Sequence, residues 1–243
     1  MVIDFLAAIR KESARFSQLA RSVPHDVPVP HLPGWTVHDL VAHLAGDYRW
    51  AQQIITSRVR PSAGLRAVDF IGEALCDEWD TVAAELLELL TFCDPGSACP
   101  NFAQGDDGMV AWWVRHQAHE TTLHRWDLEA AAGRHTPIVA AMALDGIDEL
   151  FPVYAERYSP FALTAPVTLG CPGHGRAWTV APVGDGTFVR ATRTDELTST
   201  DVMAAPDVLQ LALWNRILLG DPRVRITANE VQVRALFDGP LTA

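Results

Sequence analysis

The sequence predicts an all-helical bundle of the four-helix type, followed by a small domain that mixes helices and strands (α plus α+β). Apolar residues recur at helical spacing up to about residue 155, in runs separated by joints rich in proline and glycine. Beyond Ser159 and Pro160 the runs become short and rich in β-branched residues, which is typical of strands. We therefore expect a helical domain over residues 1–158 and an α+β domain over residues 159–243.

Five helices are expected in the first domain, and local signals mark their ends. The prolines between Pro24 and Trp35 cannot continue a helix, and Thr36 with Asp39 has the pattern of an N-cap with an acid in the first turn. Gly133 is suited to end the fourth helix. Together with the apolar spacing, these signals place helices at about residues 2–22, 36–60, 67–92, 109–132 and 138–154.

The second domain has the alternating composition of an α+β fold. Short β-branched or aromatic segments predict strands near residues 167–169, 177–181 and 187–192, and a fourth near 224–227. Helical spacing returns near residues 206–219 and 230–237.

The composition is that of a packed globular protein. Of the 243 residues, 49% are hydrophobic and 20% are charged, which excludes a disordered chain. No stretch reaches ~18 uninterrupted apolar residues, so no transmembrane helix is expected. The first residues lack a basic segment before their apolar run, so they do not predict a signal peptide. We expect a cytoplasmic protein.

The charge balance argues against nucleic acid as a partner. With 19 basic and 30 acidic side chains the net charge is −11, and no basic run is visible that could bind phosphates despite this charge. The four cysteines contain no C-x-x-C spacing, so reduced, unpaired thiols are expected. We therefore expect small molecules as partners and expect no association with a membrane. The chain is expected to be a monomer or a weak dimer.

Histidines on the fourth predicted helix provide the main chemical signal. His116, Glu120 and His124 are four residues apart, so each lies only ~40° around the helix axis from the next. Glu120 and His124, one turn apart, can bind one ion. His116 and His124 lie ~12 Å apart along the axis, which is too far for them to share it. The string HETTLH is one residue longer than the zincin H-E-x-x-H motif, so the metalloprotease interpretation fails.

A further ligand must come from elsewhere, and His43 is the candidate. It lies midway along the second predicted helix among apolar neighbours, so it is expected to face the interior of the bundle. Taken alone, this pattern favours a core histidine that is hydrogen-bonded to a backbone or carboxylate partner. With Glu120 and His124 across the bundle, it also allows a three-ligand His/Glu/His site, which leaves a coordination position open as in catalytic zinc sites.

Two longer motifs, PGWTVHDLVAHLAGDYRWA at residues 33–51 and AHETTLHRWDLEAAAG at residues 118–133, resemble the mycothiol-dependent maleylpyruvate isomerase family. That family is a branch of the DinB-like metal-binding helix bundles. The resemblance implies a divalent metal, with zinc as the expected ion, held by His43, Glu120 and His124. It also implies a C-terminal domain similar to sterol carrier proteins.

The resemblance further implies a reaction class. The metal would activate the thiol of mycothiol, which would add to a small electrophile and lead to isomerisation or to S-conjugation. An arginine of the C-terminal domain would hold a substrate carboxylate; Arg216 is the first candidate, followed by Arg223 and Arg225. Each of these arginines could equally be a solvated surface residue.

Three acids lie near the candidate ligands in the sequence. Asp39 and Asp47 are one helical turn either side of His43, and Asp127 is three residues after His124. A ligating histidine usually donates its second N–H to a carboxylate or carbonyl, so these acids are candidates to support the ligands. The alternative for each is a solvated surface acid.

Two other functions remain open at the level of sequence. The same metal could activate water, which would make the protein a hydrolase. The chain could also be a non-enzymatic protein whose C-terminal domain holds a small apolar ligand. The metal is not fixed by the ligand types either, because a His/Glu/His site accepts zinc, nickel, iron or cobalt.

Overall fold

The computed structural model describes residues 2–61, 64, 66–103, 108–156, 160–196, 199–239 and 241. The chain divides into two compact units, and each is described by itself. The first comprises Met1–Asn101 with Asp106–Pro137, and the second comprises Phe102–Gly105 with Ile138–Ala243. The expected domain boundary at residues 158/159 stays a prediction.

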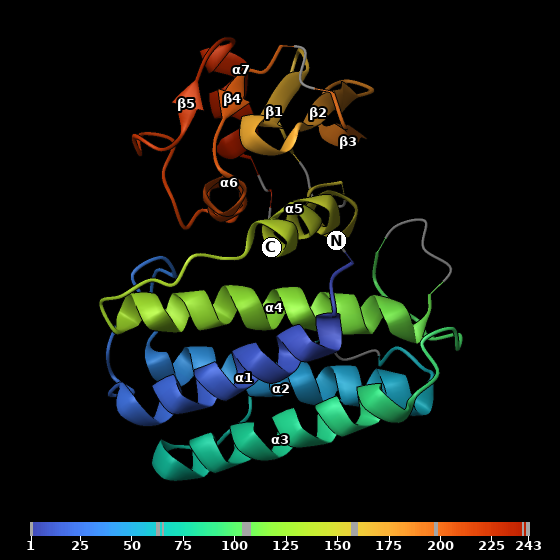
Figure 1. Ribbon diagram of the computed structural model, residues 1–243, viewed down its shortest axis with the longest axis vertical. Helices are drawn as coiled ribbons and strands as arrows, with labels where there is room; N and C mark the ends of the chain where they lie inside the picture. The colour runs from blue at the N-terminus through green and yellow to red at the C-terminus, as the bar shows by residue number, and fades with distance from the viewer. Residues whose placement is uncertain are drawn as a thin grey trace. The chain divides into compact units, whose positions relative to one another are not determined.

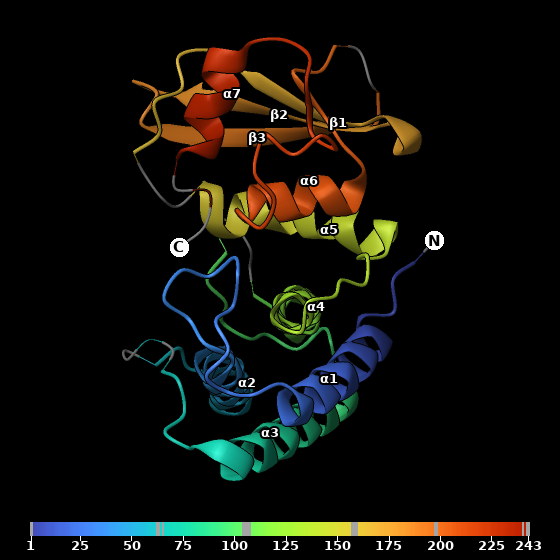
Figure 2. The same ribbon diagram turned by 90° about the vertical axis from the view of Figure 1, so that its left-hand side faces the viewer.

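The first unit is a bundle of four long helices (Figure 1). Helix α1 packs on α3 and α4, and α2 also packs on both of these helices. Figure 2 views α2 and α4 almost along their axes, with α1 and α3 crossing beside them. The bounds are Phe5–Ser22 for α1, Val37–Ser57 for α2, Gly72–Phe92 for α3 and Val110–Ala131 for α4.

The helix ends follow from the capping residues that the sequence offers. The Asp4 side chain accepts a hydrogen bond from the backbone N–H of Ala7 and so caps α1. Thr36 and Asp39 form a complete capping box at the start of α2. Just beyond α4, Gly133 adopts a φ of 70°, a left-handed conformation that glycine adopts without strain. The expected start of the second helix after Thr36 and the expected end of the fourth helix before Gly133 are confirmed.

An aromatic cluster joins the four helices of the bundle. Trp79 on α3 is fully buried, and its ring lies 4.7 Å from that of Phe16 and 4.8 Å from that of Tyr48. The indole N–H of Trp79 donates to Ser17, and the Tyr48 hydroxyl is hydrogen-bonded to Thr121 on α4. Each buried polar tip therefore has a partner, as a tightly packed core requires.

A glycine inside α2 allows a neighbouring segment to cross the helix closely. A Cβ at Gly46 would lie 2.0 Å from the carbonyl oxygen of Arg66. The crossing segment is held by a hydrogen bond of 3.1 Å from the Val68 N–H to the carbonyl of Ala42. Any side chain at Gly46 would therefore push this segment away from α2. Gly46 lies three residues after His43 and one residue before Asp47, so the displacement would occur close to the candidate ligand.

The second unit is a five-stranded sheet with helices on both faces. The strand order is β3-β2-β1-β4-β5, with β1 and β4 parallel and the other pairs antiparallel. Figures 1 and 2 show α5 and α6 side by side on one face and α7 on the other. The bounds are Ala140–Leu150 (α5), Val167–Cys171 (β1), Arg176–Val183 (β2), Phe188–Thr194 (β3), Val202–Met203 (β4), Pro206–Leu213 (α6), Arg225–Ile226 (β5) and Glu230–Phe237 (α7).

The predicted fold class, a helical bundle followed by a small α+β domain, is confirmed, while several element ends differ. The helix expected to reach residue 219 ends at Leu213, because Asn215 adopts a left-handed φ of 60° that breaks the helical path. The third helix begins at Gly72 rather than near residue 67. The fifth helix ends at Leu150 and continues as one π-helical turn over Phe151–Ala155.

Two further expectations concern the chain as a whole. None of the helices in the described part of the chain combines the length and the hydropathy that a bilayer-spanning segment needs. The four cysteines are unpaired, as expected, and Cys76, Cys99 and Cys171 are buried.

Candidate metal centre

Three predicted ligands meet between helices α2 and α4. His43 comes from the middle of α2, while Glu120 and His124 come from successive turns of α4. One donor atom of each lies within 4.8 Å of the donor atoms of the other two. The rings of His43 and His124 lie 5.2 Å apart at 81° to each other. The structure therefore brings together two helices' donors at one point, as the sequence predicts.

The side chains of Glu120 and His124 are largely buried. Glu120 Oε2 lies 3.5 Å from His124 Nε2, and the exposed fractions of the two side chains are 12% and 8%. His116 lies one turn before Glu120 and its Nε2 is 3.9 Å from Glu120 Oε1. In the described residues, the only group that meets the distance limits for a shared ion is His43, Glu120 and His124.

His124 is held by a second carboxylate. Its Nδ1 lies 3.0 Å from Oδ2 of Asp127, and the Asp127 side chain is fully buried. Burial by itself lowers the pKa of His124, but the hydrogen bonds to Asp127 and Glu120 outweigh this and raise it to about 9. With the Nδ1–H donated to Asp127, Nε2 faces Glu120. This is the arrangement in which histidine binds metals.

The donor set fits a divalent cation. Two imidazole nitrogens and one carboxylate suit zinc, nickel, iron or cobalt, and three protein ligands leave at least one coordination position for another molecule. The raised pKa of His124 points the same way, because the surrounding carboxylates stabilise a positive charge at this place. These residues can therefore hold a metal ion, and its identity stays a prediction.

The remaining predicted acids occupy two different environments. Asp47 is buried, and its Oδ2 accepts a hydrogen bond of 2.8 Å from Gln117 on α4. Burial, together with the nearby charge of Glu120, raises the pKa of Asp47 to about 6. Asp39 instead uses its carboxylate in the capping box with Thr36, whose N–H and hydroxyl both donate to Oδ2. A role of Asp39 toward His43 stays a prediction.

Sequence reasoning did not single out Trp35 or Gln117 at this site. The Trp35 ring lies 5.0 Å from the His43 ring in an edge contact at 65°. The loop before α2 holds Trp35, since its N–H donates to Leu32 and its carbonyl accepts from Val29. Two signals could have indicated them. Trp35 stands directly before the N-cap of a helix, and Gln117 is a lone glutamine on a buried helix face.

Arg216, the predicted substrate-binding residue, lies in the second unit. It is buried, with only 7% of its surface exposed, and its Nη1 donates to the backbone carbonyl of Trp214 at 2.8 Å. Its guanidinium lies 5.7 Å from the centre of the Trp214 ring. A role of Arg216 in holding a substrate carboxylate stays a prediction.

Comparisons with known proteins identify one family. Residues 6–129, just over half of the chain, match the model of the mycothiol maleylpyruvate isomerase N-terminal domain. The chain is also similar to a crystal structure of the mycothiol-dependent maleylpyruvate isomerase, with a TM-score of 0.62, 14% identity and 92% of each chain covered. A histidine-to-alanine mutant of that enzyme matches with a TM-score of 0.57 and 14% identity, covering 86% of this chain and 87% of the other.

At this low identity, the two solved structures establish a shared fold. A search of curated proteins gives no match. The family match rests on the segment that carries His43, Glu120, His124 and Asp127. This chain therefore belongs to the mycothiol maleylpyruvate isomerase family of enzymes.

Proposed function

We propose that this protein is a metal-dependent, mycothiol-using isomerase or S-transferase that acts on a small electrophile. The observation that carries the proposal is the convergence of His43, Glu120 and His124 from two helices, with His124 oriented by Asp127. A divalent metal bound there, with zinc as the expected ion, would lower the pKa of a thiol and supply a thiolate near neutral pH.

The chain's own residues would prepare the site in three ways. Asp127 fixes the His124 ring so that Nε2 stays directed at Glu120. The Glu120 carboxylate adds a negative charge that offsets part of the charge of a divalent cation. Gln117 holds Asp47 in place, so that a second buried carboxylate lies in the electrostatic environment of Glu120. These groups are positioned before binding, which reduces the reorganisation that a reaction would need.

The substrate class follows from the family and from the chemistry of a thiolate. The solved relatives are named for a maleylpyruvate isomerase, so a small unsaturated compound that carries a carboxylate is the expected substrate. Arg216 is the proposed carboxylate-binding residue, because a guanidinium can bind a carboxylate through two hydrogen bonds. We place the protein in the cytoplasm, where a low-molecular-weight thiol would be available, and propose a monomer or a weak dimer.

Elemental analysis tests the metal. Protein purified without chelator should contain about one divalent ion per chain. His124→Ala should lose it, whereas His135→Ala, a matched change at an exposed histidine of the same unit, should retain it. Metal that is absent from the wild type, or equally present in His124→Ala, would remove the basis of the proposal.

Turnover measurements test the thiol. The metal-loaded protein should convert members of a panel of small unsaturated electrophiles only when mycothiol is added. Turnover that is equally fast without any thiol would instead identify a metal-dependent hydrolase that uses water as its nucleophile. Replacing each cysteine by serine should leave turnover intact, since the protein thiols take no part in the proposed reaction.

A further inference from the structure

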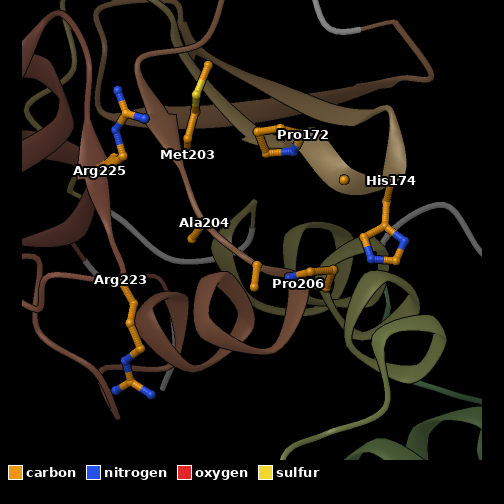
Figure 3. Close-up of a pocket in the computed structure, with 9 residues that line it drawn as sticks. Pro172, His174, Met203, Ala204, Pro206, Arg223 and Arg225 are labelled. Atoms are coloured by element: carbon orange, nitrogen blue, oxygen red, sulfur yellow. The ribbon is translucent and has the colours of Figure 1, made fainter.

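The second unit contains a cavity of its own, between β4, the start of α6 and the turn that follows β1. Its volume is about 380 Å³, within the range of pockets that hold small molecules. No residue of the helical bundle is among those that line it. Figure 3 shows the lining residues, which include Pro172, His174, Met203, Ala204, Pro206, Arg223 and Arg225.

The lining combines an apolar wall with positive charge. Pro172, Met203, Ala204 and Pro206 offer apolar surface. Two arginines stand at one side, and the described lining residues include no acid. Because the whole chain has a net charge of −11, a cavity lined by cations without a carboxylate differs from the average surface. Such a lining fits a ligand that has an apolar body and one anionic group.

The two arginines are not equivalent. Arg223 donates its Nε and Nη2 to the two carboxylate oxygens of Asp221, at 2.9 and 2.8 Å, so its charge is already offset. Arg225 is exposed, and no ion pair joins it to another residue in the described part of the chain. Its guanidinium therefore keeps its donors for a ligand, and Arg225 is the anion-binding group of this cavity.

Strand pairing places this cation beside the apolar wall. Arg225 on β5 is the cross-strand partner of Met203 on β4, so the two side chains emerge from the same face of the sheet. In Figure 3 they extend in the same direction, while Arg223 extends the other way. A ligand that binds Arg225 through its charge therefore meets the Met203 side chain with its adjoining carbons.

We propose that this cavity is a binding site for a medium-chain monocarboxylate. Its carboxylate would bind Arg225, and its chain would lie against the apolar wall of the cavity, beginning at Met203. The inference depends only on residues of the second unit, so it stands or falls independently of the metal centre and of the function proposed above.

Binding of octanoate to the full-length protein, followed by NMR, tests this site. Octanoate should bind saturably and shift the signals of Met203, Ala204 and Arg225. Octan-1-ol, which lacks the charge, and inorganic phosphate, which lacks the apolar chain, should each bind at least about tenfold more weakly. No saturable binding, equal binding of octan-1-ol or phosphate, or shifts confined to α2 and α4 would overturn the proposal.

Three arginine variants locate the charge that the carboxylate uses. Arg225→Gln should weaken octanoate binding about tenfold. Arg223→Gln should change it less than about threefold, because this guanidinium already binds Asp221. Arg234→Gln, at an exposed ion pair on α7, is the matched control and should have no effect. Equal binding by Arg225→Gln and the control would also contradict the assignment.

Discussion

In the helical unit, the polar side chains of the candidate metal centre are buried between two long helices, whereas Arg225, in the cavity of the second unit, lies on β5 at the edge of the sheet. His124, Asp127 and Asp47 are each at most 6% exposed, while Arg225 is open to solvent. Buried polar groups must satisfy one another, so removing one partner leaves another with a large desolvation cost. Exposed groups lose less, because water replaces the missing partner.

The bundle should therefore respond strongly to single changes at its centre, and the second unit weakly. The following variants test this contrast, from the largest expected effect to the smallest.

Asp127→Asn should weaken metal binding by about 10–100-fold, the usual consequence of changing the partner of a ligating histidine. The amide cannot accept the Nδ1–H of His124 with the charge that a carboxylate supplies, so the ring is less well held. Titration of metal-free protein with zinc measures the effect. Asp145→Asn on α5, in the second unit, is the control. If both variants bind zinc as the wild type does, Asp127 has no supporting role.

Metal affinity should rise about tenfold per pH unit between about pH 6.5 and 9, because metal binding must displace the proton of His124. In the metal-free protein this raised pKa also affects stability. The native state binds more protons than the unfolded state in this window, so the free energy of unfolding falls as the pH rises through it. Titrations and urea unfolding at several pH values measure both trends. His124→Ala should lose both.

Asp47→Asn should stabilise the metal-free protein by about 3 kcal/mol near neutral pH and weaken metal binding. The native pKa of Asp47 is raised from 3.8 to about 6, so its ionisation costs stability as the pH rises through this range. An amide removes that cost and still accepts the hydrogen bond from Gln117. Urea unfolding should therefore show the gain above about pH 6 and none below about pH 4. A gain that is independent of pH would contradict this explanation.

Asp148→Asn, in the second unit, should cost about 1 kcal/mol of stability and leave the metal content unchanged. Asp148 accepts hydrogen bonds from the Trp178 indole and from Arg193, and its side chain is 18% exposed, so water can replace part of what is lost. Thermal unfolding and elemental analysis measure the two results. A loss of metal in this variant would show that the two units do not respond separately.

Sequence reasoning was most successful where the geometry is local. The separation of Glu120 and His124 by one turn follows from helical spacing alone, and so does the capping box of Thr36 and Asp39. The place of His43 opposite them depends on how two helices pack, and it was reached only by assuming that its apolar neighbours face the interior. The resemblance to a family supplied the same three residues.

Contacts that depend on side-chain rotation or irregular backbone could not be predicted in this way. The pairing of Gln117 with Asp47 requires the rotation of α2 against α4, which apolar spacing fixes only coarsely. Trp35 reaches His43 from a loop whose path is set by backbone hydrogen bonds to Val29 and Leu32. The early end of α6 comes from the left-handed conformation of Asn215, which the helical pattern through this segment does not reveal.

The central claim is that one divalent ion is held jointly by residues of α2 and α4. A zinc titration of metal-free wild-type protein, His43→Ala, Glu120→Ala, His124→Ala and His116→Ala tests it most directly. The wild type should bind one ion per chain, and each of the first three variants should lose about 100-fold or more in affinity. His116→Ala, which lies outside the group of three, should stay within about tenfold of the wild type. Full zinc affinity in His43→Ala would contradict the claim, because the ion would then be held by α4 alone.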